Sequence, residues 1–400
     1  MKNKNPTEII SFVFAATVLL FATSCTTMQT EVKTTVSDEQ IAEITKQYEL
    51  ELIKLDGRAL ALQDAGLSTS TSAQSAAQNS PQSSTQTANI KTKEDFVSLK
   101  ADVDSYMTRL QKEIASPKMS RPLHCRLLAL LGRATLLDSK PVAAKKIYQE
   151  AFQIVPDDMQ VQILSLRLEN DYSKRLEKMP ATFEENTAQL EIEQALIFYY
   201  MGQYKKAAAS FDNAFSQLDE AYRTAYGKLR DTSWVLQNAV GTVTEDSTAK
   251  ILSAEGMINL IQSETNLLVK ITGGKTLRAK DIAKKLESEK IISTDISRKV
   301  GDRHSTLYRS DIAQVLWSLY INYKNPNANV NYAEHYAEHY AEHYAEQQSP
   351  IPDVKVDDVC FNSVAGCIEN EIMSLPDGIN FEPSKTVSGA EFIKILQNIK

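Results

Sequence analysis

Apolar residues recur at helical spacing along most of this chain. One such segment covers residues 37–66, where Ser37 and Asp38 are expected caps and the apolar positions are Ile41, Ile44, Leu50, Ile53 and Leu60. Residues 92–116 return to this spacing through Phe96, Leu99, Val103, Tyr106 and Leu110. Between them, residues 67–91 are dominated by Ser, Thr, Gln and Ala, which predicts a flexible linker. The pattern as a whole predicts an all-α fold.

A regular alternation of small and large residues marks the segment 125–158. Its characteristic positions are Leu128, Leu131, Gly132, Ala144, Tyr148, Ala151 and Pro156. This spacing resembles the tetratricopeptide repeat, two antiparallel helices packed through small residues. A second copy is expected over 188–220, through Ala195, Phe198, Gly202, Tyr204, Ala207, Phe211 and Ala214. Because one helix pair cannot cover its own apolar face, we expect a superhelix of repeats over residues 92–269.

In the repeat family that this pattern resembles, the first helix of each pair lines a binding groove. Carried over place by place, the resemblance nominates Arg126, Ala129 and Arg133 in the first copy, and Gln189, Ile192, Leu196 and Tyr199 in the second. Arginines and an exposed tyrosine suit an acidic or extended peptide. The alternative is that Leu196 and Tyr199 pack against the neighbouring repeat and bind nothing.

Three strings in the C-terminal third, 276–286, 306–316 and 386–396, align without gaps. They share a Thr, an aliphatic residue, an acidic sixth residue and a final Leu. In the last string, Ser388 and Glu391 have the spacing of a capping box. Together with the Asp377-Gly378 turn, this string is similar to the surface-layer homology motif. The resemblance implies a small, mostly helical motif over 352–400 and degenerate copies over 270–324.

Motifs of this kind bind an anionic cell-wall polymer, and a motif arginine helps to hold it. Only Arg309 occupies that place here, because Ala279 and Gly389 replace the arginine in the other strings. Because a single arginine cannot bind several acidic groups at once, the sequence gives little support for multivalent recognition of an acidic glycan. Two interpretations therefore stand: a protein-contact module or fold relic, and a glycan binder with Arg309 as its weak candidate.

Residues 325–351 are expected to be a linker that contains a tandem Tyr-Ala-Glu-His repeat. On a helix, His335, His339 and His343 would stack along one face, where such pairs can chelate a divalent transition metal. A short repeat without apolar support is more typical of a surface linker. The sequence therefore assigns no metal site.

A short basic start, an uncharged stretch over residues 9–22 and then Cys25 mark the beginning of the chain. This resembles the lipobox of bacterial lipoproteins, in which the cysteine is acylated and the signal peptide, here residues 1–24, is removed. The resemblance implies a lipidated N-terminus over 25–36 and a place in the cell envelope, at the periplasmic or surface face of the outer membrane. An ordinary secretory signal and an uncleaved membrane anchor are the alternatives.

Net charge, cysteine spacing and the search for catalytic motifs each limit the functions that the sequence allows. A formal net charge of -7 provides no general basic field for nucleic acid. Cys360 and Cys367 are candidates for a disulfide, but one continuous helix would hold them about 10 Å apart, so the bridge requires a break between them. Neither a complete phosphate loop nor a nucleophilic His, Cys and Asp set stands out, so no enzyme activity and no cofactor are expected.

The sequence therefore predicts a membrane-anchored envelope protein that recruits a protein or peptide partner through its repeats. The alternative is an anchor on a cell-wall or envelope polysaccharide, held through the C-terminal module.

Overall fold

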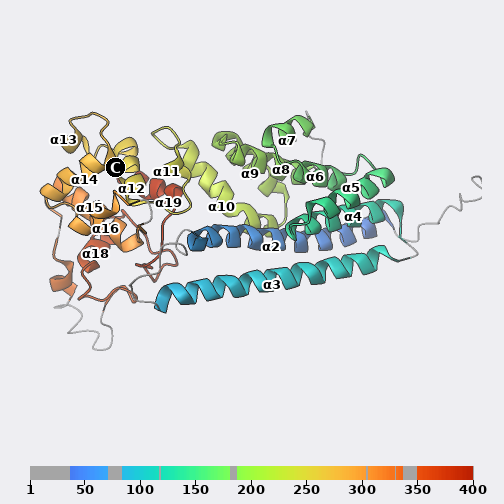
Figure 1. The fold of residues 1–400 in the computed structure, drawn as a ribbon, viewed down its shortest axis with the longest axis horizontal. Coiled ribbons are helices and arrows are strands. Elements are labelled where there is room, and N and C mark those ends of the chain that lie inside the picture. The colour runs from blue at the N-terminus through green and yellow to red at the C-terminus, as the bar shows by residue number, and fades with distance from the viewer. Residues whose placement is uncertain are drawn as a thin grey trace, which may run out of the picture. The chain divides into compact units, whose positions relative to one another are not determined.

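The structure is a computed structural model, and its described residues are mostly helical (Figure 1). Those residues are 37–70, 83–116, 119–180, 187–302, 305–328, 330–336 and 349–399. They contain no β-strand, only an isolated antiparallel bridge between Tyr308 and Thr386. The predicted all-α fold is confirmed. The chain divides into a first unit, residues 1–49 and 105–165, and a second unit, residues 50–104 and 166–400.

Two long helices, α2 (Asp38–Ser70) and α3 (Ser83–Ile114), open the described chain. Both extend into the predicted linker 67–91, so that prediction is wrong at both ends; residues 71–82 lie outside the described residues. The extensions, residues 67–70 and 83–91, consist largely of Ser and Thr, which are only moderate helix formers, so they are helical as continuations of existing helices. Within the second unit the two helices are paired, since Arg58 Nη1 lies 2.6 Å from Asp102 Oδ2. Helix α2 therefore belongs to the folded body.

In the first unit, α4 (Arg121–Leu137) and α5 (Pro141–Ile154) form a helix pair, followed by α6 (Met159–Leu168), whose last residues belong to the second unit. Ala151 is fully buried at the contact, and its carbonyl oxygen lies 3.4 Å from Cys125 Sγ of α4. Gly132 lies at a different contact, between α4 and α6, because a Cβ there would lie 2.4 Å from Leu164 Cδ2 of α6. The small residues thus allow two helices, α5 and α6, to pack closely against α4, whereas the sequence suggested only one such helix.

The second unit contains α7 (Tyr172–Lys178), the pair α8 (Ala188–Tyr200) and α9 (Tyr204–Gln217), and α10 (Glu220–Gln237). The turn between α8 and α9 is built like the turn between α4 and α5. Gln203 N–H donates to Phe198 O at 2.8 Å, as Lys140 N–H donates to Thr135 O at 3.0 Å. Both turns need a left-handed residue, which is Gly202 in one and Ser139 in the other. The two predicted repeat segments are therefore helix pairs with the same turn.

One apolar core runs from Leu236 to Leu396 and forms the C-terminal module. Its helices are α11 (Glu245–Thr248), α12 (Ala254–Glu264), α13 (Val269–Thr272), α14 (Ala279–Ser288), α15 (Thr294–Lys299), α16 (Arg309–Leu319), the π-helix η1 (Tyr320–Lys324), α18 (Phe361–Glu369) and α19 (Gly389–Asn398). The predicted boundary at 269/270 is wrong, because the start of α19 holds the segment before α12. Leu252 N–H donates to Val387 O, and Gly389 N–H donates to Ala249 O, both at 2.8 Å.

The three aligned strings each begin a helix at their fourth residue: Ala279, Arg309 and Gly389. The predicted capping box in the last string is half formed. Ser388 Oγ accepts from Glu391 N–H at 3.2 Å, but the Glu391 carboxylate accepts instead from Arg309 Nη1, also at 3.2 Å. An ionised partner competes successfully with a backbone N–H for this carboxylate.

The beginning of the predicted linker 325–351 is packed on the C-terminal module. The ring of Tyr332 is buried, and its centroid lies 5.9 Å from that of Trp317. Tyr336 Oη donates to Glu369 Oε1 at 2.7 Å. The linker prediction is therefore wrong for these residues, because the tyrosines of the repeat supply apolar area that the core buries.

Gly389→Ala is expected to lower the free energy of unfolding by about 1–3 kcal/mol or more. A Cβ at residue 389 would lie 1.9 Å from the backbone oxygen of Asp246, and backbone cannot turn aside as a flexible side chain can. Gly227→Ala in α10 is the matched control, since nothing lies within 4 Å of its Cβ position. That substitution should be neutral or stabilising by up to about 1 kcal/mol. Urea unfolding measures both, and equal destabilisation would contradict the prediction.

Candidate functional site

The predicted groove residues differ in how far the fold buries them. In the first unit Ala129 and Arg133 are buried, and Arg126 is half-buried with its Nε 2.8 Å from Asp158 Oδ2. In the second unit Ile192 is buried, whereas Gln189, Leu196 and Tyr199 are half-buried. Leu196 and Tyr199 pack against the same buried apolar cluster as Ile192.

In the first unit, α2 contacts the predicted groove through a buried polar chain. Arg133 Nη1 donates to Gln160 Oε1 at 2.9 Å, and Gln160 Nε2 donates to Glu49 Oε1 of α2 at 2.8 Å. The Arg133 side chain is only 2% exposed. Arg133 therefore serves an intramolecular contact and presents no surface to a partner.

In the second unit, Arg167 of α6 binds three other helices at once. Its Nη1 lies 2.6 Å from Asp56 Oδ2 of α2, and its Nη2 lies 2.8 Å from Glu193 Oε1 of α8. Tyr226 of α10 accepts from Arg167 Nη2 at 3.0 Å and donates to Asp56 Oδ2 at 2.5 Å. Burial by itself would lower the pKa of Arg167, but Asp56 and Glu193 raise it well above its usual value. We call Arg167, Asp56, Glu193 and Tyr226 the Arg167 network, in which the guanidinium of Arg167 stays charged.

Apolar contacts fill the space beside the Arg167 network. Ile53 of α2 belongs to the same buried cluster as Ile192, Phe211 and Tyr226. At Gly57, a Cβ would lie 2.7 Å from the Cα of Ala225, so the backbones of α2 and α10 are in close contact. The inner face of the second helix pair is thus covered by the protein's own N-terminal helix.

Aromatic side chains gather where α7, α8 and the start of α9 meet. The Tyr172 and Tyr200 rings are stacked with centroids 5.0 Å apart, and the Arg175 guanidinium lies 4.7 Å from the centroid of the Tyr172 ring. Tyr199 contacts the edges of both Tyr200 and Tyr204, at 5.3 and 5.7 Å. Burial raises the pKa of Tyr204, whereas Tyr200 keeps 45% of its surface exposed. We call Tyr172, Tyr199, Tyr200, Tyr204 and Arg175 the tyrosine cluster.

Sequence analysis nominated one member of the tyrosine cluster, Tyr199, as a groove residue, and named Tyr204 only as a position of the repeat pattern. The consecutive Tyr199-Tyr200 pair was the available signal, because two adjacent residues of a helix cannot both face its buried side. Tyr172 and Arg175 come from a helix that the repeat pattern did not include. Tyrosine and arginine are the residue types that most often dominate protein interfaces, so the cluster is a candidate interaction surface.

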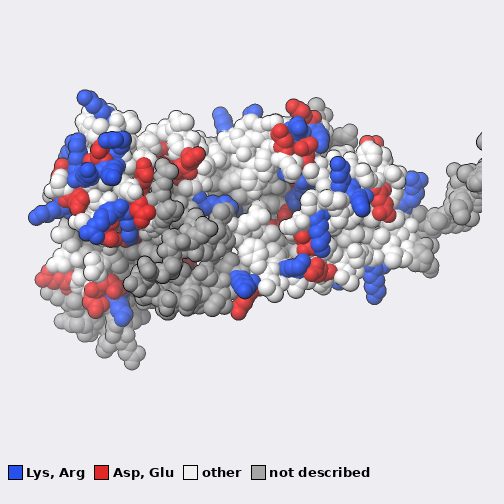
Figure 2. Space-filling model, viewed as in Figure 1, with Lys and Arg blue, Asp and Glu red and all other residues white. Residues whose placement is uncertain are grey.

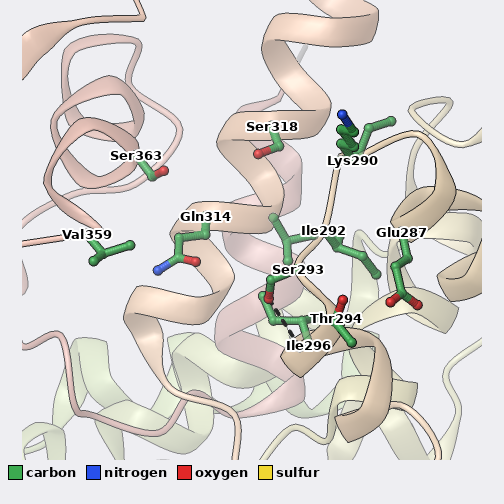
Figure 3. A pocket seen from close by; sticks show the side chains of 12 residues that line it. Glu287, Lys290, Ile292, Ser293, Thr294, Ile296, Gln314, Ser318, Val359 and Ser363 are labelled. Atoms are coloured by element: carbon green, nitrogen blue, oxygen red, sulfur yellow. Dashed lines mark hydrogen bonds between the residues drawn. The ribbon is translucent and has the colours of Figure 1, made fainter.

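A pocket of about 420 Å³ lies in the C-terminal module, between α16, α18 and the segment joining α14 to α15 (Figure 3). Its polar groups are mostly amide and hydroxyl groups, from Gln314 and Ser318 of α16, Ser363 of α18, and Ser293 and Thr294. Ile292 and Val315 add apolar surface. Glu287 at its edge has a lowered pKa, because the hydroxyls of Ser297 and Thr294 hydrogen-bond to its carboxylate. The groups suit a small hydroxylated ligand.

Arg309, the weak glycan candidate, is a buried structural residue. Its Nη1 donates to Glu391 Oε1, its Nη2 donates to the carbonyl of Ser374, and the guanidinium carbon lies 4.8 Å from the centroid of the Phe381 ring. Burial lowers its pKa. With a side chain only 4% exposed, Arg309 cannot contact a polymer in this conformation. Gly389, which replaces a motif arginine, has no room for any side chain.

The predicted disulfide is absent, since Cys360 and Cys367 are both free thiols. Cys360 caps α18 and Cys367 lies two turns along the same helix, so the break that a bridge requires does not occur. Burial raises the pKa of the Cys367 thiol, and its Sγ lies 3.5 Å from the carbonyl oxygen of Ala313. It is a core residue.

The predictions for the His repeat and for Cys25 concern residues that lie partly or wholly outside the described ranges. His335 is exposed, whereas His339, His343 and Cys25 lie outside the described residues. Within the described ranges, no three His, Cys, Asp or Glu side chains gather as a metal site requires. None of the described helices is long and apolar enough to cross a membrane.

Comparison of the chain with protein-family models, with curated proteins and with solved structures finds no match.

Arg167→Met is expected to lower the free energy of unfolding by about 3–5 kcal/mol, because it leaves the carboxylates of Asp56 and Glu193 without their counter-charge. Arg230→Met is the matched control. Arg230 also pairs with two carboxylates, those of Asp212 and Asp231, but at a partly exposed position, and its loss should cost about 1 kcal/mol or less. Urea unfolding followed by circular dichroism measures both, and the prediction fails if the two variants lose similar stability.

Proposed function

We propose that this protein is a membrane-anchored cell-envelope lipoprotein that acts as a protein-protein interaction scaffold. The observation that carries the proposal is the tyrosine cluster, where α7, α8 and the start of α9 meet. The partner class is an envelope protein or peptide, and no cofactor takes part. The anchor is the acylated Cys25 that the lipobox resemblance implies.

The scaffold uses the tyrosine cluster rather than the side of α8 that contacts α2. Ile192 of α8 lies in one buried cluster with Ile53, and Glu193 pairs with Arg167, so neither residue is free to contact a peptide. Tyr200, by contrast, is half exposed and is held in place by stacking on Tyr172. A rigid aromatic side chain loses little conformational entropy when it is buried by a partner. The tyrosine cluster therefore combines exposed apolar area with a preorganised shape.

A photo-cross-linking residue placed at position 200 is expected to join this protein to a distinct envelope protein in intact cells. Adding Tyr172→Ala should reduce the product by about thirtyfold, because a tyrosine at the centre of an interface contributes about 2 kcal/mol. Mass spectrometry identifies and quantifies the product.

The matched control places the same residue at Phe152 in α5, which is 44% exposed and also aromatic. Equal products at both positions would show unspecific collision and would refute the scaffold. Cys25→Ala tests the anchor separately: the product and the membrane fraction should be lost together. If the product persists in Cys25→Ala cells, the anchor is wrong and the scaffold stands.

A second candidate function is an anchor on an envelope polysaccharide, and the pocket of the C-terminal module favours it. Its amide and hydroxyl groups can exchange hydrogen bonds with sugar hydroxyls without relying on Arg309.

If this second function holds, Gln314→Ala combined with Ser363→Ala should weaken co-sedimentation with purified cell-wall material about thirtyfold, from two hydrogen bonds of about 1 kcal/mol each. Gln397→Ala is the control, because Gln397 is exposed on α19 of the same module and outside the pocket. Unchanged sedimentation of the double variant, or equal loss in the control, would exclude the pocket as the binding site.

A further inference from the structure

The segment from α13 to α15 has a charge opposite to that of the whole chain. Residues 269–302 contain nine Lys and Arg against five Asp and Glu, a formal charge of +4, while the chain carries -7. Figure 2 shows Lys and Arg gathered on the face that Figure 1 assigns to α13, α14 and α15. Six lysines of this segment are exposed and form no ion pair with a described residue: Lys270, Lys275, Lys280, Lys284, Lys285 and Lys290. We call them the lysine surface.

Four of the five acidic residues of the same segment have partners other than the six lysines. Asp281 pairs with Arg278 at 2.8 Å, and Glu289 accepts from Tyr323 Oη at 2.7 Å. Glu287 accepts from the hydroxyls of Ser297 and Thr294. Asp295 lies 3.5 Å from the ammonium nitrogen of Lys299. The lysine surface therefore keeps its positive charge.

Helix α14 shows how the fold separates charge from core. Ile282, Ala283 and Leu286 are fully buried on one face, while Lys280 and Lys284 lie one turn apart and are exposed. Val269, directly before Lys270, is 47% exposed and adds apolar area at the edge of the surface. An exposed row of lysines beside an exposed apolar residue suits a charged interface between water and lipid.

We propose that the lysine surface binds the anionic headgroups of a bilayer and holds the C-terminal module against the membrane. Lysine ammonium groups are point charges, which suit a layer of mobile headgroups, whereas bidentate recognition of a fixed acidic group favours arginine. The choice of a membrane over a dissolved polyanion rests on the proposed anchor at Cys25. Residues 25–36 can span at most roughly 40 Å, so an acylated chain keeps the folded body near the bilayer.

The test measures the reactivity of individual lysines in the purified full-length protein. Vesicles of phosphatidylcholine, alone or mixed with phosphatidylglycerol, are added, the amines are acylated briefly, and mass spectrometry quantifies each lysine. Lys275, Lys280, Lys284 and Lys290 should be protected at least about threefold by the anionic vesicles only, and raised salt should remove the protection. Four exposed lysines outside the segment should not change and provide an internal control: Lys145, Lys146, Lys174 and Lys205.

Two variants with the same net charge test whether the location of the lysines, and not only their number, decides the binding. Replacing Lys275, Lys280, Lys284 and Lys290 by Gln should abolish protection of the remaining Lys270 and Lys285. Replacing Lys145, Lys146, Lys174 and Lys205 by Gln changes the net charge equally and should leave that protection intact. Circular dichroism confirms that both variants are folded.

Three outcomes overturn the proposal: equal reactivity in both vesicle types, protection of the control lysines to the same extent, or protection by dissolved dextran sulfate but not by anionic vesicles. The intact mass of the protein reports acylation of Cys25 independently. Loss of acylation with preserved protection contradicts the anchor alone, while vesicle-bound, acylated protein with fully reactive lysines contradicts the lysine surface alone.

Discussion

The buried guanidinium of Arg167 is the constraint on which the second unit depends. A charge in this position must be neutralised within the protein, and Asp56, Glu193 and Tyr226 do so from three separate helices. Replacing one residue of such a group costs far more than the group contributes to stability, because the remaining charges stay buried. The network therefore specifies a single arrangement, since a shift of α2 by one residue would turn Asp56 away by about 100°.

This arrangement decides where the protein can bind others. A helix pair with an open inner face would offer it to a peptide, but Ile53 and Asp56 of α2 already occupy that face in the second unit. The remaining surfaces differ in chemistry. The tyrosine cluster presents stacked aromatic rings, while the lysine surface presents unpaired charge. A scaffold that also touches a membrane needs two surfaces of these two kinds, one for a protein and one for lipid headgroups.

The C-terminal module shows how one sequence pattern can hold residues with different tasks. Ala279, Arg309 and Gly389 occupy the same place in three aligned strings, and each begins a helix. Arg309 turns inward to the third string and pairs with Glu391. Gly389 allows the start of α19 to contact the backbone of α11. The absence of arginine at residue 389 is thus a packing requirement, independent of any loss of glycan binding.

Local signals in the sequence determined much of the secondary structure. The apolar period predicted most helices, Ser388 was recognised as a cap, and the repeat-like spacing placed the two helix pairs in the correct segments, because these features depend on neighbours a few residues away. The sequence also contained the partners of Arg167 and Arg133, but nothing local marks Asp56 and Glu49 of α2 as their counter-charges, which lie 111 and 84 residues earlier. Burial of a charge is decided by which helices come together, and only the tertiary structure shows that α2 covers the inner face of the helix pairs.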